Sequence, residues 1–279
     1  MKVKGVIFDW AGTTVDFGCF APVNVFLTVF EDAGIKVTLE EARKPMGMLK
    51  IDHIRTMLEM PRIREVWNRK YGRDFTEQDV LALYRQFESR LMESLATYTD
   101  PIQHVKETVH RLREEGIRVG STTGYTDSMM EVVTQYAAVK GYEPDFLVTP
   151  TQVGDKGRPY PYMIFKNMEA LGIKATKQVV KIGDTTSDIK EALNAGVWAV
   201  GVIVGSSEMG LSEEEFMALS EENQQIAIEK TARIFKETGA HYTIQTMEEL
   251  PVLLETINER LEQPYHKVES DGEKSETSL

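Results

Sequence analysis

Short apolar runs alternate with helical patterns over most of the chain. Runs rich in Val, Ile and Phe predict strands at residues 4–8, 117–121, 146–149, 179–182, 197–204 and 242–245. Between them, apolar residues at helical spacing predict helices, for example at 126–140, 160–171 and 187–195, each followed by a glycine that stops it. This alternation is typical of the α/β class, in which helices cover a parallel sheet.

Residues 18–99 break this rhythm, because they contain no convincing strand. Gly34 stops one helical pattern, and Thr38 with Glu41 has the spacing of a capping box that starts another. Helical patterns in this stretch cover 23–30, 49–59 and 76–95. The stretch therefore predicts an all-helical cap inserted into the α/β core.

The change of pattern divides the chain into three parts. Residues 1–17 and 100–262 are expected to form the core, and residues 18–99 the inserted helical cap. Residues 263–279 are polar and show no periodicity, so we expect them to be a disordered tail.

Composition and charge narrow the classes of function. The chain of 279 residues has no apolar run near the roughly 18 residues that span a membrane. A net charge of −12 disfavours nucleic acid or an anionic membrane as a partner, so an anionic substrate would need local cations or a metal ion. The N-terminus begins a strand without a signal-peptide pattern, and the single Cys19 excludes an internal disulfide. A cytoplasmic protein is therefore expected.

Polar residues stand at the ends of three predicted strands. Asp9 follows the first, Thr123 and Gly124 follow the second, and Asp184 follows the strand at 179–182. Ligands of an open parallel sheet bind outside the carboxyl ends of its strands, so these residues are expected to converge. Each of them alone could be a helix cap, but their joint placement favours a site.

The residue types at this edge suit phosphoryl transfer. Two neighbouring carboxylates repel each other unless a cation separates them, and Mg²⁺ prefers oxygen ligands such as these. Asp9 could then stay ionised as a nucleophile toward phosphorus, with the Thr123 hydroxyl holding phosphoryl oxygens. Arg158 precedes Pro159, which favours an extended backbone, and would supply a permanent positive charge.

The segments DWAGTTVD, STTG, GRPYP and GDTTSD, in this order, resemble the four motifs of the haloacid dehalogenase superfamily of phosphotransferases. The resemblance spans residues 9–188 and implies a Rossmann-like core with a mobile cap inserted after the first motif. It also implies that Mg²⁺ is the cofactor, held by Asp9, the backbone carbonyl of Ala11 and Asp184. Asp188 would be a supporting carboxylate.

Ala11 departs from the usual pattern of this superfamily. In its phosphatases, the residue two places after the nucleophile is an aspartate that protonates the leaving alcohol, which contributes about 10²–10⁴ in rate. A carbon leaving group would gain nothing from an acid aimed at oxygen. It needs an electron sink instead, such as the protonated imine formed by a lysine and an aldehyde. Ala11 therefore suits cleavage of a carbon–phosphorus bond.

The segment PMGMLKIDHIR offers such a lysine. Helical spacing would place Lys50 on one face with Met46 and His53, where lost hydration lowers the pKa of its amine and frees it for attack on a carbonyl. With Ala11 and STTGYT, this segment resembles the branch of the superfamily that cleaves carbon–phosphorus bonds, from residue 1 to about residue 262. The resemblance implies an imine at Lys50, a small phosphonate substrate and a homodimer joined through the cap.

Some roles and two other functions stay open. His53 could move protons at the imine or only complete a buried face. Met46, Cys19 and Tyr125 could line the aldehyde pocket or serve packing. One alternative is a phosphomonoesterase that uses another proton donor, for which His53 is the candidate. The other is a non-catalytic module that binds phosphorylated ligands, although such decay should also have altered the polar residues at the strand ends.

Overall fold

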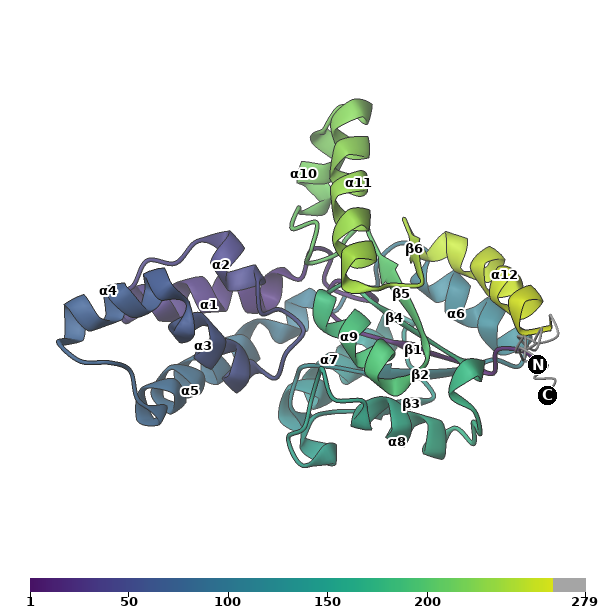
Figure 1. Ribbon diagram of the computed structural model, residues 1–279, viewed down its shortest axis with the longest axis horizontal. Coiled ribbons are helices and arrows are strands. Elements are labelled where there is room, and N and C mark those ends of the chain that lie inside the picture. The colour runs from purple at the N-terminus through teal and green to yellow at the C-terminus, as the bar shows by residue number, and fades with distance from the viewer. Residues whose placement is uncertain (263–279) are drawn as a thin grey trace, which may run out of the picture.

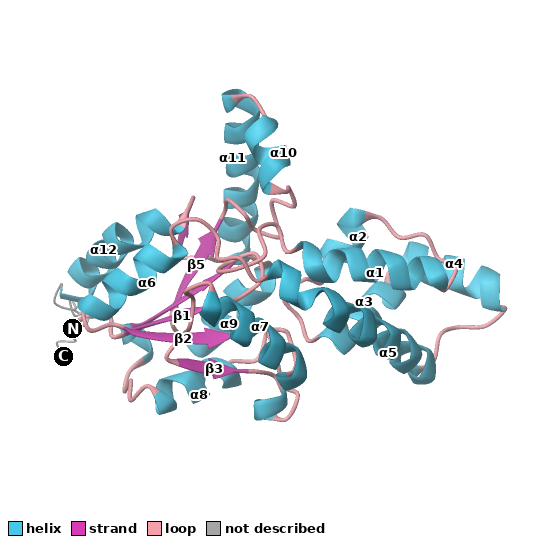
Figure 2. Cartoon of the chain, turned by 180° about the vertical axis from the view of Figure 1, so that it is seen from behind, coloured by secondary structure: helices cyan, strands magenta, loops and turns pink. Residues whose placement is uncertain are grey.

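The computed structural model describes residues 1–262, and in this part of the chain six parallel strands form one sheet (Figures 1 and 2). The strands are β1 (Gly5–Phe8), β2 (Arg118–Thr122), β3 (Phe146–Val148), β4 (Val179–Gly183), β5 (Trp198–Val202) and β6 (Tyr242–Ile244). Their order is β3-β2-β1-β4-β5-β6. The predicted α/β class is therefore confirmed, with each strand within a few residues of its expected place.

Helices cover both faces of the sheet. Its helices are α6 (Val105–Glu114), α7 (Asp127–Val139), α8 (Tyr162–Ala170), α9 (Thr186–Ala195), α10 (Glu213–Ala218), α11 (Glu221–Thr238) and α12 (Leu250–Glu262). Short 3₁₀ helices are η1 (Leu95–Tyr98), η2 (Thr151–Val153), η3 (Thr176–Gln178) and η4 (Met247–Glu249). Figure 1 shows the α10–α11 hairpin projecting away from the sheet. Among residues 1–262, no helix combines the length and apolarity needed to cross a membrane.

Strand β1 lies at the centre of the sheet and positions the first carboxylate. It pairs with β2 on one side and β4 on the other, and all four of its residues are buried. Ile7 belongs to an apolar cluster with Ile164 of α8 and Ile189 of α9, whereas Val6 and Phe8 join the larger cluster on the opposite face. A strand buried on both faces explains its unbroken apolar run.

The helical cap lies beside the sheet (Figure 1). Its helices are α1 (Phe20–Asp32), α2 (Leu39–Arg43), α3 (Lys50–Glu59), α4 (Pro61–Tyr71) and α5 (Glu77–Ser94). Phe26 of α1 stacks on Phe87 of α5 with ring centroids 4.2 Å apart, and the capping box of Thr38 and Glu41 forms as predicted. The Rossmann-like core with a helical cap is confirmed. Its division at 1–17, 18–99 and 100–262 stays a prediction, and 263–279 lies outside the described residues.

The chain enters the cap through a tightly curved linker. Asp16, Gly18 and Cys19 all have positive φ angles, of 55°, 78° and 54°. Asp16 accepts hydrogen bonds from the backbone N–H groups of Phe20 and Ala21, both at 3.0 Å, and so satisfies the start of α1 in place of its N-cap residue. The linker therefore has a defined conformation, although the sequence analysis did not single out Asp16.

Candidate active site

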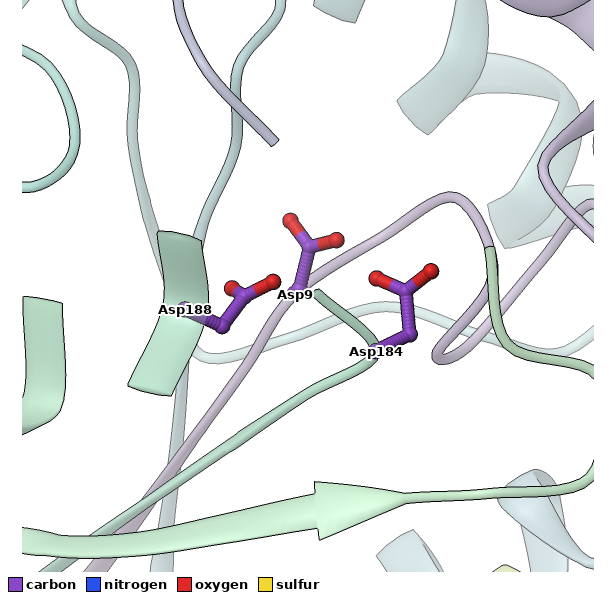
Figure 3. A group of neighbouring side chains, drawn as sticks. All are labelled: Asp9, Asp184 and Asp188. Atoms are coloured by element: carbon purple, nitrogen blue, oxygen red, sulfur yellow. The ribbon is translucent and has the colours of Figure 1, made fainter. Parts of the chain in front are cut away.

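Three carboxylates converge at the carboxyl edge of the sheet (Figure 3). Asp9 directly follows β1, Asp184 directly follows β4, and Asp188 lies in the first turn of α9. All three are buried, and one oxygen from each lies within 4.8 Å of those of the other two. The adjacency of β1 and β4 produces this approach, as the strand-end argument predicted.

The charges of this cluster are unevenly compensated. Burial raises the pKa of Asp184 well above its usual value, and the neighbouring Asp9 and Asp188 raise it further. Burial also raises the pKa of Asp188, but the cations Arg158 and Lys181 outweigh it, so that this pKa is lowered. A cluster with excess negative charge and only oxygen donors fits a hard divalent cation such as Mg²⁺.

Backbone and hydroxyl groups fix the orientation of Asp184. Its Oδ2 accepts a hydrogen bond from the backbone N–H of Ser207 at 2.8 Å, and its Oδ1 accepts one from the Thr13 hydroxyl at 3.3 Å. Gly12 has φ of +84°, and a β-carbon built there would lie 2.1 Å from Asp184 Oδ2. The first motif therefore needs a glycine both for its turn and for this close approach.

Arg158 joins the carboxylates to a second layer of buried polar groups. Its Nη2 donates to Asp9 Oδ1 at 2.6 Å and to the Thr122 hydroxyl at 2.8 Å, while its Nε donates to Glu191 Oε2 at 3.0 Å. Lys181 lies 2.8 Å from Asp188 Oδ1. Sequence reasoning found Arg158 but missed Glu191 and Lys181. A charged residue within a helix or strand pattern is usually exposed, so the sequence gave no signal that these two are buried.

A small pocket lies beside the carboxylates, with a volume of about 20 Å³. Its lining comes from both parts of the fold: Asp9, Ala11, Cys19, Met46, Gly47, Lys50, Thr123, Gly124, Tyr125, Arg158, Asp184 and Thr185. Most of the predicted site residues are thus brought together. His53 and Asp188 are the two that do not line the pocket, and Gly47 and Thr185 are the two that the sequence analysis did not name.

Lys50 is the first residue of α3 and is buried. Its Nζ lies 3.8 Å from Met46 Sδ and 5.2 Å from the centre of the Tyr125 ring. Burial lowers the pKa of the Lys50 amine, which the negative charge of Asp9 partly opposes. The predicted helix face is wrong in one detail, since Met46 lies in the turn before α3. Gly47, with φ of +84°, separates that turn from the helix.

His53 is fully buried behind Lys50. Its Nε2 lies 2.8 Å from the carbonyl oxygen of Ala42, so this nitrogen carries the proton, and the ring stacks on Phe26 at 3.9 Å. Burial and the charge of Lys50 lower the pKa of His53 well below its usual value. These contacts favour packing between α2 and α3 over proton transfer in the pocket.

Cys19 and Tyr125 add neutral groups to the pocket wall. Burial raises the pKa of both the thiol and the phenol well above their ordinary values, and nearby carboxylates including Asp16 add to the effect. The hydroxyl oxygen of Tyr125 is buried without a hydrogen-bond partner among the described residues. It points to a place where a bound polar group could be satisfied.

The turn before α3 closes the pocket over the edge of the sheet. A β-carbon built on Gly124 would lie 2.7 Å from the carbonyl oxygen of Met48, so only glycine permits this approach. The Ser187 hydroxyl donates to the carbonyl of Met46 at 3.0 Å. Beside Gly124, Thr123 Oγ1 accepts the N–H of Tyr125 at 3.1 Å. Cap and core therefore meet directly at the site.

Comparisons with known proteins agree with this arrangement. A sequence model of the haloacid dehalogenase-like hydrolases matches residues 3–196. The chain is 80% identical over 261 residues to the phosphonoacetaldehyde hydrolase of Lysinibacillus sphaericus (strain C3-41), a match that covers 94% of this chain and 97% of the relative.

Two further relatives extend the comparison. A bifunctional phosphonoacetaldehyde hydrolase/aminoethylphosphonate transaminase of Clostridioides difficile (strain 630) is 54% identical, over 95% of this chain and 42% of its own length. Among solved structures, a phosphonoacetaldehyde hydrolase-like protein from Oleispira antarctica superposes with a TM-score of 0.91 at 38% identity, over 94% of each chain. The likeness thus includes both the helical cap and the sheet.

Proposed function

The chain belongs to the haloacid dehalogenase-like hydrolases, and on this premise we propose that it hydrolyses the carbon–phosphorus bond of phosphonoacetaldehyde to acetaldehyde and phosphate. The observation that carries the proposal is that Lys50 of the cap and Asp9 of the core line the same pocket. An amine with a lowered pKa and a nucleophilic carboxylate are the two groups that this reaction requires. The names of the relatives with 80% and 54% identity agree with it.

The reaction begins at Lys50. The neutral amine attacks the aldehyde carbon, one proton is taken up, and loss of water gives a protonated imine. Burial favours the neutral amine, and the surrounding Met46 and Tyr125 keep bulk water away from the reacting carbon. The imine places a positive nitrogen two bonds from the carbon that holds phosphorus, so this nitrogen can accept the departing electrons.

Phosphoryl transfer follows at Asp9. A carboxylate oxygen attacks phosphorus, the carbon–phosphorus bond breaks, and its electron pair forms the double bond of an enamine on Lys50. Arg158, 2.6 Å from Asp9 Oδ1, holds the nucleophile in place. When bound, Mg²⁺ would neutralise charge on the phosphonate oxygens, and Asp9, Asp184 and the carbonyl of Ala11 are the groups that would hold it.

Two hydrolyses complete the turnover. The enamine takes up a proton at carbon, and water releases acetaldehyde and the free Lys50 amine. A second water hydrolyses the aspartyl-phosphate, which regenerates Asp9 and gives phosphate. One water was released when the imine formed, so the net reaction consumes a single water molecule. Ala11 suits this sequence, because no alcohol oxygen has to be protonated.

The biological setting follows from the same substrate. We place the reaction after a transamination in the degradation of 2-aminoethylphosphonate, since the Clostridioides difficile relative carries a transaminase in the same chain. A cytoplasmic homodimer joined through the cap completes the proposal.

The phosphomonoesterase alternative loses support in this geometry. It needs a proton donor near residue 11, and His53 was its candidate. His53 does not line the pocket, and its protonated Nε2 is occupied by the carbonyl of Ala42.

Trapping of the imine tests the proposed function. Borohydride added together with phosphonoacetaldehyde should inactivate the protein permanently, and peptide mapping should place the reduced adduct on Lys50. Lys50→Arg keeps a positive charge but cannot form the imine, so it should lose acetaldehyde release and trapping together. Lys70 is an exposed lysine of α4, and Lys70→Arg is the matched control, which should behave as wild type.

The alternatives give different results. A wild type that releases acetaldehyde without trapping, or an adduct on a different lysine, would contradict the assigned role of Lys50. A wild type that hydrolyses phosphate esters but not phosphonoacetaldehyde would restore the phosphomonoesterase alternative.

A further inference from the structure

Arg43, the last residue of α2, reaches from the cap to the core without lining the pocket. Its Nη1 donates to the carbonyl oxygen of Gly18 at 2.6 Å, in the linker that enters the cap. The same nitrogen lies 3.3 Å from Ser207 Oγ and 3.5 Å from the Ser207 carbonyl oxygen, in the loop after β5. One guanidinium thus touches the cap, the linker and the core.

The environment of this guanidinium is costly for a residue that only packs. Its central carbon lies 4.7 Å from the centre of the Phe20 ring, a favourable cation–π contact. Its Nη2, however, is buried and has no hydrogen-bond partner among the described residues. An unsatisfied buried donor lowers stability, so packing alone does not account for an arginine at this position.

Ser207 connects Arg43 to the active site. While its side chain and carbonyl face Arg43, its backbone N–H donates to Asp184 Oδ2 at 2.8 Å. Figures 1 and 2 both show α2 on the side of the cap toward α10. A displacement of the cap would therefore remove the Arg43 contacts from Ser207, the residue whose N–H helps to orient Asp184.

We propose that Arg43 is a positioning residue that couples closure of the cap to the orientation of Asp184 through Ser207. This inference rests on the proposed function, because closure also brings Lys50 over Asp9. When the cap is closed over an imine, Arg43 supports Ser207, and Ser207 orients Asp184 for phosphoryl transfer. When the cap moves away from the core, Ser207 loses this support, and only the Thr13 hydroxyl among the two partners of Asp184 is still fixed.

Three readouts separate this role from a purely structural one. Arg43→Met keeps the apolar part of the side chain against Phe20 but removes the hydrogen bonds. We expect its kcat for acetaldehyde release to fall on the order of 10–100-fold, as for other small misplacements of catalytic groups. The Mg²⁺ concentration for half of the metal-induced rise in Tm should increase. Trapping of Lys50 by borohydride at saturating aldehyde should stay near the wild-type level.

Two further variants complete the experiment. Arg43→Lys keeps a positive charge and three donors, but its ammonium ends one bond short of the position of Nη1. It should therefore weaken the contacts to Gly18 and Ser207 without abolishing them, and lie between wild type and Arg43→Met in kcat and in the Mg²⁺ midpoint. Among residues 1–262, the hydrogen bonds of Arg62 in α4 stay within the cap, to Glu41 and Lys36, so Arg62→Met should match wild type in both quantities. If Arg43→Met does not fold, Arg43→Lys carries the comparison.

The inference is overturned if the Arg43 variants show wild-type kcat and Mg²⁺ midpoints. It is also overturned if trapping falls in parallel with turnover, because Arg43 would then only hold the cap together. Failure of the proposed function looks different, since wild type itself would release no acetaldehyde. The Mg²⁺ midpoints of the Tm measurement would still decide whether Arg43 acts on Asp184.

Discussion

Arg158 Nη2 lies 2.6 Å from Asp9 Oδ1, with both side chains almost fully buried. Burial lowers the pKa of Arg158, but Asp188, Asp9 and Glu191 outweigh it, so this pKa is raised well above its usual value. The guanidinium therefore stays charged at any pH that the fold survives. A permanent cation in contact with Asp9 holds in place the carboxylate that attacks phosphorus in the proposed mechanism.

Asp9→Asn tests the nucleophile. The amide cannot form the phosphorylated intermediate, so turnover should fall on the order of 10⁴-fold or more, as when other catalytic nucleophiles are removed. Lys50 is unaffected, and borohydride trapping should persist. Acetaldehyde release measures the first effect and peptide mapping the second. Steady phosphate release by this variant, with deamidation excluded by mass spectrometry, would contradict an aspartyl-phosphate.

Ala11→Asp tests the meaning of the departure in the first motif. A carboxylate at residue 11 would lie beside Asp9 and the other acids, where it adds repulsion and crowds the imine. We expect phosphonoacetaldehyde cleavage to weaken at least tenfold, roughly one pKa unit of added repulsion. Weak phosphate-ester hydrolysis should appear. Ala11→Ser, which adds a polar but uncharged group to alanine, is the control. Unchanged phosphonate cleavage in Ala11→Asp would show that alanine is merely tolerated.

The pKa of Lys50 predicts a pH dependence. Imine formation needs the neutral amine, and burial lowers the pKa of Lys50. The rate of trapping should therefore rise with pH and then level off. The midpoint of the rise should lie below about 10.4, the usual pKa of lysine. Met46→Glu would place a carboxylate near Nζ and should move the midpoint upward by about one unit or more. Met46→Gln should not, and equal midpoints in the two variants would argue against this environment.

Gly12→Ala separates backbone strain from loss of the site. Gly12 and Gly72 both have positive φ angles, so alanine at either should cost about 1–2 kcal/mol in the free energy of unfolding. Only at residue 12 would the added carbon meet Asp184; at Gly72 nothing lies within 4 Å. Denaturant unfolding should show the cost of backbone strain alone in Gly72→Ala and a larger loss in Gly12→Ala, where the clash adds to the strain. Activity and the Mg²⁺-induced rise in Tm should fall only in Gly12→Ala. Equal activity of the two variants would contradict the tight contact.

Much of the fold and the centre of the site could be predicted from local sequence. The apolar run before Asp9 and the one before Asp184 mark buried strands, and parallel strands bring their carboxyl ends together whatever the details of packing. Lys50 could also be predicted from local sequence, through its apolar neighbours and through Ala11. These are features that a few adjacent residues determine.

The second layer could not be predicted in that way. Glu191 and Lys181 look like ordinary exposed positions of a helix and a strand, and only the assembled sheet shows that they are buried around Arg158. Arg43 contacts Ser207, a residue 164 positions away, and no local pattern records such a distance. Met46 was wrongly expected on the helix of Lys50, because the turn at Gly47 that precedes α3 depends on the approach of the core at Thr185.

Lys50 belongs to the inserted cap, whereas Asp9 directly follows the first strand of the sheet. A ligand that engages both must carry a carbonyl and a phosphonate at the separation that the closed cap sets. Simple aldehydes and simple phosphonates each satisfy only one of the two parts, and a longer chain between the groups would hold the cap away from the sheet. The fold therefore selects substrates by the distance between their carbonyl and phosphonate groups. A change in the length of the turn before α3 would be a direct way to alter which distance is accepted.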